Sequence, residues 1–423
     1  MSAVHELDEL IDAPARLAAD VLEDGLPGGG EVRTAFQPIV ELQSGAVVGF
    51  EALTRGPAGT ALEAPMRLFE AVEQVGARDR FDRACRDASL ASAIRAELLP
   101  PLSVFVNVEP ALVEGQLGDD VDSTWRRAPE DLRCVIEVTE RALTARPAEL
   151  LHAIAEIRDL SWGVALDDVG VDPRSIALMS LLRPDVIKLD RSVIQAVPGR
   201  EIAQIASAVA AQAERTGAVV VAEGVETEEH EHAAITLGAT LAQGYRYGRP
   251  GPLPTPLPRP GSPIVFIDHG LQQGGPTPYQ RTNQLQAGRR GSMKMLTAMI
   301  DHLAGQAAGQ GTDAVVLALR LPDVGVLDGV ADSASLVGLL ADEPQRVATD
   351  GELRVAVLDP GEALGREIAL VVLAPHFAAA ITARAIGDDP DDPAAPVDLC
   401  SVYDRDTVVE CAHTLAARLP RRD

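Results

Sequence analysis

The sequence predicts an α/β protein with a (β/α)8, or TIM-type, barrel whose first strand is antiparallel, and a second, smaller α/β domain. Eight short apolar runs rich in β-branched residues lie within 34–248, and amphipathic stretches at helical spacing separate most of them. Only the three residues 43–45 separate the first two runs, a gap typical of a β-hairpin. Longer helical connections are typical of parallel strands, so eight such strands fit a closed barrel.

Each expected strand is an apolar run bounded by polar or glycine-containing segments. One connecting helix is expected at 201–217, where apolar residues recur at helical spacing and Gly217 closes the segment. The expected strands of the barrel cover 34–42, 46–53, 103–108, 133–139, 163–168, 186–190, 218–225 and 241–248.

Composition divides the chain on either side of this barrel. Residues 1–31 are acidic and rich in alanine, which predicts an N-terminal extension before a barrel domain at 32–249. Seven prolines fall within 250–263 and disfavour helix and sheet, so a stiff, extended linker is expected there. Because this linker follows the last strand, we expect it to tether the next domain near the mouth of the barrel.

Residues 264–423 have a different layout and are expected to form the second α/β domain. Helices are expected at 292–309, 376–386 and 405–418. The strands expected in this domain cover 313–321, 353–359, 368–374 and 397–403.

Charge and cysteine usage restrict the classes of function. The formal charge is −26, from 37 basic and 63 acidic residues, which disfavours long nucleic acids and anionic membranes as partners. The four cysteines form no C-x-x-C pair, so neither a zinc site nor a disulfide framework is expected. The N-terminus does not resemble a signal peptide, and no apolar run approaches the ~20 residues that span a bilayer. We therefore expect a cytoplasmic protein.

Polar side chains end seven of the eight predicted strands. The carboxyl ends of barrel strands meet on one face, where barrel enzymes carry their active sites. Converging carboxylates repel one another unless a cation lies among them, and oxygen donors favour one or two Mg²⁺ or Mn²⁺ ions over zinc. Paired ions are typical of water attack on phosphate esters. The strand-end residues are Glu51, Asn107, Glu137, Asp167, Asp168, Lys188, Glu223 and Gln243.

Each of these residues alone also has an ordinary structural explanation. A single glutamate at a strand end is commonly a solvated carboxylate, and Asn107 or the aspartate pair could cap a helix. Lys188 could extend its ammonium to solvent. However, Lys188 and Lys294 are the only lysines of the chain, and arginine replaces neither a compact nor a titratable ammonium. The combination favours a catalytic lysine that holds or activates an attacking water.

Seven motifs, in order, are FQPIVELQSGAVVGFEALTR (36–55), FVNVEP (105–110), IEVTE (136–140), ALDDVG (165–170), DVIKLD (185–190), VVVAEGVET (219–227) and AQGYRYGRP (242–250). With this order and spacing, roughly 34–250 resembles the EAL-domain family of cyclic di-GMP phosphodiesterases. The resemblance implies hydrolysis of one phosphodiester bond of cyclic di-GMP to linear pGpG, with Mg²⁺ or Mn²⁺ as cofactor.

The resemblance also implies a role for each candidate residue. Asp168 matches a ligand of a second metal ion, and Lys188 matches the lysine that contacts the attacking water. Glu223 matches a glutamate near the second ion and this water, and Gln243 matches a residue that positions the water. Glu140 matches a glutamate that pins the loop after the aspartate pair. The first-metal ligands would be Glu51, Asn107, Glu137 and Asp167, and the dinucleotide would be held by Gln37, Leu53 and Arg55.

One loop departs from the family pattern. The family reads DDFGTGYSS, whereas residues 167–175 read DDVGVDPRS, and the family loop supports the second metal ion and contacts of a homodimer through the barrel. A slow or silent cyclic di-GMP receptor is therefore the alternative to a phosphodiesterase. A third hypothesis is an unrelated barrel enzyme that acts on phosphorylated metabolites, because a fold alone does not fix a function.

The second domain resembles the DICT sensory domain. The residues that carry this resemblance are KMLTAMIDHL (294–303), IALVVLAPHFAAAITAR (368–384) and VYDRDTVVECAHTLA (402–416). The resemblance implies a regulatory domain with an unknown ligand or protein partner. His376 and Cys400 could contact such a ligand, or they could be satisfied structural residues.

Overall fold

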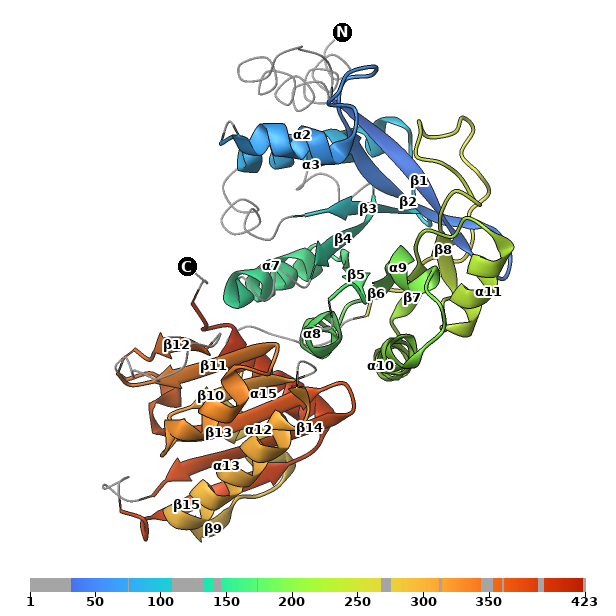
Figure 1. The fold of residues 1–423 in the computed structure, drawn as a ribbon. Coiled ribbons are helices and arrows are strands. Elements are labelled where there is room, and N and C mark those ends of the chain that lie inside the picture. Colours follow the sequence, from blue (N-terminus) through green and yellow to red (C-terminus); the bar gives the residue numbers. More distant parts are fainter. Residues whose placement is uncertain are drawn as a thin grey trace.

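Two domains lie side by side in the computed structural model of the chain (Figure 1). The blue-to-yellow part of the chain forms the barrel, and the orange-to-red part forms the second domain. No helix among the described residues is both long and apolar enough to cross a membrane. The structure describes residues 32–74, 76–108, 132–139, 146–172, 174–267, 275–311, 314–343, 353–359, 361–386 and 392–420.

The first domain is a closed barrel of eight strands in sequential order. The first strand pairs antiparallel with its two neighbours, and the other strand pairs are parallel. The predicted barrel with an antiparallel first strand is thereby confirmed. Its strands are β1 (Arg33–Glu41), β2 (Val47–Arg55), β3 (Ser103–Asn107), β4 (Arg133–Thr139), β5 (Gly163–Val169), β6 (Val186–Leu189), β7 (Val219–Ala222) and β8 (Leu241–Gln243).

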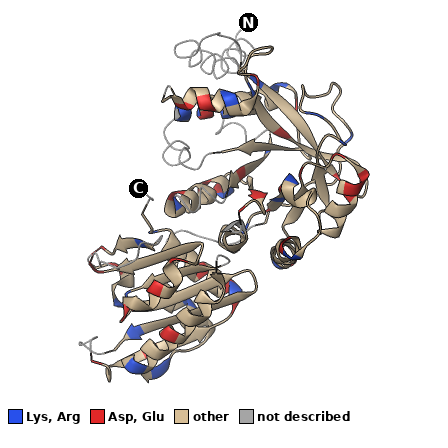
Figure 2. Cartoon of the chain, viewed as in Figure 1, with Lys and Arg blue, Asp and Glu red and all other residues tan. Residues whose placement is uncertain are grey.

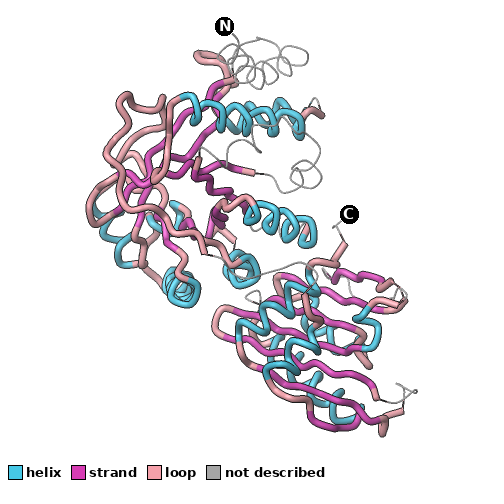
Figure 3. The backbone as a smooth tube through the Cα atoms, turned by 180° about the vertical axis from the view of Figure 1, so that it is seen from behind, coloured by secondary structure: helices cyan, strands magenta, loops and turns pink. Residues whose placement is uncertain are grey.

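Helices cover the outside of the barrel, as Figure 3 shows from behind. In α10, Ile205, Ala208 and Val209 fall on one buried face, and Gly217 ends the helix with φ +75°. The sequence placed this helix within one residue of its observed bounds. The described helices of this domain are α2 (Pro65–Gln74), α3 (Arg78–Arg95), α7 (Pro147–Asp159), α8 (Arg174–Leu182), α9 (Arg191–Ile194), α10 (Arg200–Thr216) and α11 (Glu228–Thr236).

The proline-rich segment lies along the barrel rather than standing free of it (Figure 3). Gly251 exchanges backbone hydrogen bonds with Phe36, and the Gly261 amide donates to the carbonyl of Val47 at the start of β2. Ile264 then joins the apolar cluster inside the barrel. The chain therefore leaves the barrel at the amino ends of its strands, and the expected tether near the mouth is wrong.

The second domain is a seven-stranded sheet between two layers of helices. Alternate residues of β10 pack toward α13 on one face and toward α15 on the other. The strand order is β12-β11-β10-β13-β14-β15-β9. The elements are α12 (Pro278–Leu285), β9 (Arg289–Ser292), α13 (Met293–Ala308), β10 (Val315–Leu319), the 3-10 turn Val324–Leu327, α14 (Asp328–Ala331), β11 (Leu336–Ala341), β12 (Leu353–Val357), the 3-10 turn Ala363–Arg366, β13 (Glu367–Ala374), β14 (Phe377–Ala385), β15 (Pro396–Val402) and α15 (Arg405–Ala416).

The helix expected at 376–386 is wrong, because Phe377–Ala385 is strand β14. Five alanines give this segment a high helix propensity, but it pairs with strands on both sides and is buried over most of its length. The two residues Pro375 and His376 reverse the chain after β13. Tertiary pairing therefore overrides local propensity here.

Candidate active site at the carboxyl ends of the barrel strands

The barrel strands bring the predicted strand-end residues together. In the backbone register Asn107 lies opposite Glu137, and the Glu223 amide donates to the carbonyl of Leu189. Figure 2 shows acidic positions, in red, on barrel strands that otherwise carry few charges. The strands supply Glu51 from β2, Asn107 from β3, Glu137 from β4, Asp167 and Asp168 from β5, Lys188 from β6 and Gln243 from β8, with Glu223 directly after β7.

Lys188 is fully buried among these side chains, and its ammonium faces four carboxylates. Nζ lies 2.6 Å from Glu137 Oε1, 2.8 Å from Glu223 Oε1 and 3.0 Å from Asp167 Oδ1. Glu51 Oε2 is the fourth partner, at 3.7 Å. One positive charge therefore balances only part of the negative charge that the barrel gathers here.

The pKa values of these groups reflect that shortage of positive charge. Burial would lower the pKa of Lys188, but its carboxylate neighbours, Asp167 foremost, raise that pKa well above its usual range. Burial and the Glu51 charge raise the pKa of Glu137 well above its usual value. Burial also raises the pKa of Glu223 to about 8, although Lys188 opposes this shift. Burial would raise the pKa of Glu51 too, but the Lys188 charge and hydrogen bonds lower it overall.

Two side-chain amides fix the orientation of Glu51. Asn107 Nδ2 donates to its Oε1 at 3.2 Å, and Gln243 Nε2 donates to its Oε2 at 2.5 Å. The Gln243 amide also donates to Gln37 Oε1 at 3.1 Å, and Gln37 Nε2 donates to the Gly248 carbonyl at 3.0 Å. This chain of hydrogen bonds ties the carboxylate to three barrel strands and to the loop after β8.

The oxygen atoms of the cluster suit a divalent cation. One carboxylate oxygen each from Asp167, Asp168 and Glu223 lies within 4.8 Å of the others. Both carboxylate oxygens of Glu137, and Oδ1 of Asp167, lack a well-directed hydrogen-bond donor among the described residues. Buried carboxylates with excess negative charge and spare lone pairs are the donors that Mg²⁺ and Mn²⁺ prefer. The residues present therefore fit these metals.

The turn from β5 to α8 keeps Asp168 in the cluster although its sequence departs from the family pattern. Asp168 has φ +56°, in the left-handed region that residues with a Cβ rarely adopt. Gly170 has φ +103°, and a Cβ there would lie 2.3 Å from Val193 Cγ2. Such a backbone persists only where its surroundings enforce it. Here the result is an Asp168 carboxylate beside those of Asp167 and Glu223.

Two cavities meet at Leu53, next to the carboxylate cluster. One has a volume of about 290 Å³ and includes Arg55 and Asn107 in its lining. The other has a volume of about 240 Å³ and includes Gln37 and Glu223. The site therefore has two lobes that meet where the carboxylates gather, a shape that suits a ligand with two similar bulky halves.

The structure places all but one of the predicted site residues around this cluster or its cavities. The exception is Glu140, which lies outside the described residues, as does Pro173 of the altered loop. The sequence reasoning missed Phe69 and Arg78, which line the larger cavity from α2 and α3. The guanidinium carbon of Arg78 lies 5.5 Å from the centre of the Phe69 ring. Nothing in the sequence near the strand ends indicated that these helices would reach the site.

Tyr245 is a second residue that the sequence reasoning missed. It lines the smaller cavity and is half exposed. The guanidinium carbon of Arg249 lies 4.0 Å from the centre of its ring, which is cation–π geometry. Tyr245 is two residues beyond Gln243 within the motif 242–250, so the motif carried a signal for it.

The topology and the carboxylate cluster define the class of protein, a barrel whose strand ends suit divalent metal ions. Comparison with known proteins identifies the family. The EAL domain model matches residues 20–250, which is more than half of the chain, so the chain belongs to the EAL-domain family. The match begins within the segment expected to be an N-terminal extension.

Curated relatives resemble the same part of the chain. The cyclic di-GMP phosphodiesterase RocR of Pseudomonas aeruginosa is 29% identical over 251 residues, covering 58% of this chain and 62% of RocR. The cyclic di-GMP phosphodiesterase NbdA of the same organism is 33% identical over 228 residues, covering 52% of this chain and 29% of NbdA. The uncharacterised protein y4lL of Sinorhizobium fredii is 32% identical and is covered to 27%. The chain thus spans from about a quarter to less than two thirds of the length of these relatives.

A solved structure shows a similar partial match. Klebsiella pneumoniae BlrP1 in its manganese and cyclic di-GMP complex is 28% identical, with a TM-score of 0.46. The match covers 54% of this chain and 57% of that one.

Proposed function

We propose that the barrel hydrolyses one phosphodiester bond of cyclic di-GMP to give linear pGpG, with one or two Mg²⁺ or Mn²⁺ ions as cofactor. The observation that carries this proposal is the buried carboxylate cluster around Lys188 in a chain of the EAL family. Relatives named as cyclic di-GMP phosphodiesterases support the choice of substrate. The two cavities that meet at Leu53 suit the two guanosine halves of this dinucleotide.

The residues divide the work of hydrolysis. Divalent ions bound by Glu51, Asn107, Glu137, Asp167 and Asp168 would supply Lewis-acid activation of water and phosphate. The water oxygen forms a bond to phosphorus and the bond from phosphorus to the ribose 3′ oxygen breaks, which gives the 5′-phosphate of pGpG. The 3′ oxygen takes up a proton from solvent and leaves as the 3′ hydroxyl.

Three further side chains act on the water and the phosphate. Glu223, whose carboxylate lies 2.8 Å from Lys188 Nζ, accepts a proton from the water. Lys188 offsets negative charge that develops on the phosphate, and Gln243 positions the water. Arg55 donates to phosphate oxygens, while Gln37 and Leu53 hold the dinucleotide.

A single incubation tests the activity. The full chain is mixed with cyclic di-GMP and Mn²⁺, and pGpG is followed by chromatography. We expect pGpG to form, and we expect Asp167→Asn to reduce its formation at least a hundredfold, because the variant loses a buried anionic ligand. Glu63→Gln is a control, since the Glu63 carboxylate is half exposed and pairs with Arg33 at 3.3 Å outside the cluster. Equal turnover in Asp167→Asn and wild type would contradict the assignment.

The altered loop favours one alternative, a cyclic di-GMP receptor without turnover. Calorimetry with cyclic di-GMP separates the two functions. Micromolar or tighter binding together with no pGpG would identify a receptor, whereas binding with turnover supports the phosphodiesterase. The carboxylate of Asp168 within reach of Glu223 favours turnover, because binding alone does not require it.

The proposal extends to the second domain. We expect this DICT-like domain to regulate the barrel in response to an unidentified ligand or protein, in the cytoplasm. A homodimer through the barrel is also expected, on a face other than the one that α15 covers. Light scattering of the full chain tests the dimer, and a monomer at all concentrations would exclude it.

A further inference from the structure

Helix α8 connects the metal-binding loop to the second domain. It begins only six residues after Asp168, so its first turn carries the loop that holds this carboxylate. Helix α8 also makes direct contacts with α15 of the second domain (Figure 1). Apolar side chains of both helices, among them Leu178 and Val408, belong to one buried cluster. The domains therefore share a packed core at this helix.

Polar contacts from α15 concentrate on the last turn of α8. Arg405 Nη2 donates to Ser180 Oγ at 2.5 Å and to the carbonyl of Ala374, at the end of β13, at 2.6 Å. The His413 ring nitrogen donates to the carbonyl of Leu181. One guanidinium thus ties the barrel helix to the sheet of the second domain. The His413 contact gives a partner to a carbonyl of the last helical turn, and Ser180 Oγ also donates to Gln212 Oε1 within the barrel at 3.2 Å.

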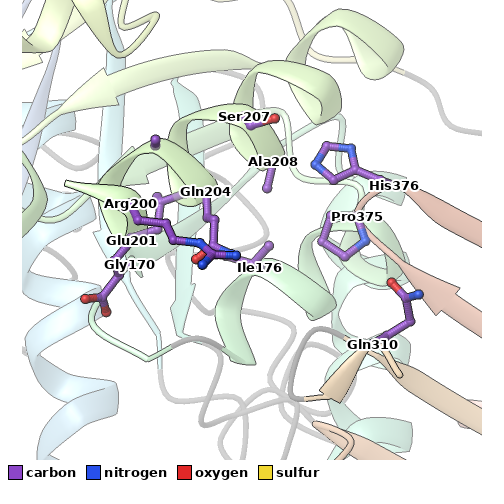
Figure 4. A pocket seen from close by; sticks show the side chains of 12 residues that line it. Gly170, Ile176, Arg200, Glu201, Gln204, Ser207, Ala208, Gln310, Pro375 and His376 are labelled. Carbon is purple, nitrogen blue, oxygen red and sulfur yellow. The ribbon is translucent and has the colours of Figure 1, made fainter. Parts of the chain in front are cut away.

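The first turn of α8 is held differently. A cleft of about 750 Å³ opens between the domains at this level, lined by Gly170 and Ile176 of the barrel and by Gln310, Pro375 and His376 of the second domain (Figure 4). Gly170 and Ile176 therefore border this cleft, although Ile176 is itself largely buried in the core. The last turn is the part of α8 that the second domain grips.

Because an α-helix is stiff over two or three turns, a tilt about one end of α8 displaces the other end. Nine residues make a helix about 13 Å long, so a tilt of about 5° around the last turn moves the first turn by about 1 Å. Displacements of this size are enough to spoil a catalytic geometry. The contact between Arg405 and Ser180 therefore bears on where the loop places Asp168.

We propose that Arg405 is a positioning residue of the metal site: through Ser180 it sets the tilt of α8 and hence the place of the Asp168 carboxylate. This inference rests on the proposed function only in assuming that the cluster binds a divalent cation. The same guanidinium donates to the carbonyl of Ala374. A movement of the turn after β13 is therefore transmitted through Arg405 and α8 to the metal site.

Mn²⁺ binding measured by calorimetry in the full chain, without substrate, tests the inference. We expect Arg405→Gln to raise the Mn²⁺ dissociation constant at least fivefold. Arg405→Lys should raise it less, because an ammonium can still reach Ser180. Arg320→Gln is the matched control: Arg320 pairs with Asp342 at 2.7 Å within the second domain, and we expect its Mn²⁺ affinity to be unchanged. In the kinetic assay, Arg405→Gln should need at least fivefold more Mn²⁺ for half-maximal rate.

Ser180→Ala removes the hydrogen bond to Arg405 from the barrel side. This second variant keeps the test decisive if an Arg405 variant fails to fold. Unchanged Mn²⁺ affinity in folded Arg405→Gln or in Ser180→Ala would overturn the inference, even if the melting temperature falls. A chain that makes no pGpG would contradict the proposed function instead, and the calorimetric comparison would still decide the role of Arg405.

Discussion

Lys188 brings together in one residue the charge, burial and chemistry of the candidate site. Its ammonium has no exposed surface and touches carboxylates on three sides within 3.0 Å. The space around Nζ therefore has no room for a larger cationic group such as a guanidinium. Replacing Lys188 by arginine keeps the positive charge but enlarges the group. This substitution therefore tests whether the site requires an ammonium or only a positive charge.

We predict that Lys188→Arg lowers pGpG production at saturating Mn²⁺ at least tenfold, a loss of about 1.4 kcal/mol in transition-state stabilisation. The planar guanidinium cannot occupy the same space beside the attacking water. Lys294→Arg is the control, because Lys294 is the other lysine of the chain and is exposed on α13. If Lys188→Arg keeps more than a tenth of the native rate, Lys188 acts only as a positive charge that balances the carboxylates.

At this scale the sequence predicted most of the site. The strand-end carboxylates, Lys188 and the amides could be located because a barrel brings the carboxyl ends of its strands to one face. Phe69 and Arg78 could not be located, because α2 and α3 reach the cavity through tertiary packing rather than through strand order. Hydrogen bonds such as that from Gln243 to Glu51 also required coordinates.

At the scale of elements, the turn between β5 and α8 is the most constrained connection of the site. The altered sequence keeps Gly170, and the structure explains why: its φ is +103° and Val193 occupies the space of a Cβ. The residues around Gly170 differ from the family, yet the carboxylate of Asp168 still joins the cluster.

We predict that Gly170→Ala destabilises the protein by about 1–3 kcal/mol and weakens Mn²⁺ binding, because the added Cβ must displace the loop or α9. Gly305→Ala is the matched control: a Cβ at this position in α13 would meet no atom within 4 Å. There, alanine should be neutral or stabilise by up to about 1 kcal/mol. Chemical denaturation and calorimetry measure the two effects, and equal behaviour of the two variants would contradict this account of the turn.

Strand β14 marks the limit of element prediction. Residues 377–380 read FAAA, and local propensity favours a helix, whereas pairing with β13 and β15 makes the segment a central strand. The strands of the barrel were easier to predict, since they are short apolar runs and amphipathic stretches at helical spacing separate most of them.

At the scale of the whole molecule, the proline-rich segment is part of the barrel. It extends from the mouth to the amino ends of the strands, where Ile264 is 3% exposed and fills the inside of the barrel. The Phe266 ring lies against Gly163 and 4.5 Å from the Arg133 guanidinium carbon. A barrel fragment that ends at residue 250 would lack this closure, so a fragment should extend to residue 267.

We predict that Ile264→Ala destabilises the barrel by about 2–4 kcal/mol, because it leaves a cavity in a closed interior. Val265→Ala is the adjacent control, since Val265 is 68% exposed and its truncation should change stability by less than about 0.5 kcal/mol. Equilibrium unfolding in urea compares the two. Similar stabilities would mean that the segment after the prolines does not close the barrel.

His413 makes the contact between the domains sensitive to acid. Its ring is partly buried against Leu181 of α8 and lies in the field of three arginines, namely Arg158 of α7, Arg183 after α8 and Arg281 of α12. Burial first, and then the arginine charges, lower the pKa of His413 to about 3, although the hydrogen bond to Leu181 opposes this shift. The folded pKa lies below the unfolded value of about 6.5, so the stabilisation is complete above that pH and is lost as the pH falls toward 3.

We predict that the contribution of His413 to stability, measured as wild type minus His413→Gln, falls between pH 7 and pH 5 by up to about 1.4 kcal/mol per pH unit below 6.5, because unfolding lets His413 take up a proton. His413→Gln keeps a donor for Leu181 but cannot titrate, and the opposite pH dependence of Glu223, whose pKa is raised to about 8, is common to both chains and cancels in the difference. His302→Gln, at an exposed position on α13, should retain the wild-type dependence. Calorimetric melting of the three full-length chains at pH 5, 6 and 7 measures this, and parallel pH profiles for wild type and His413→Gln would show that the imidazole does not link acid to the contact between the domains.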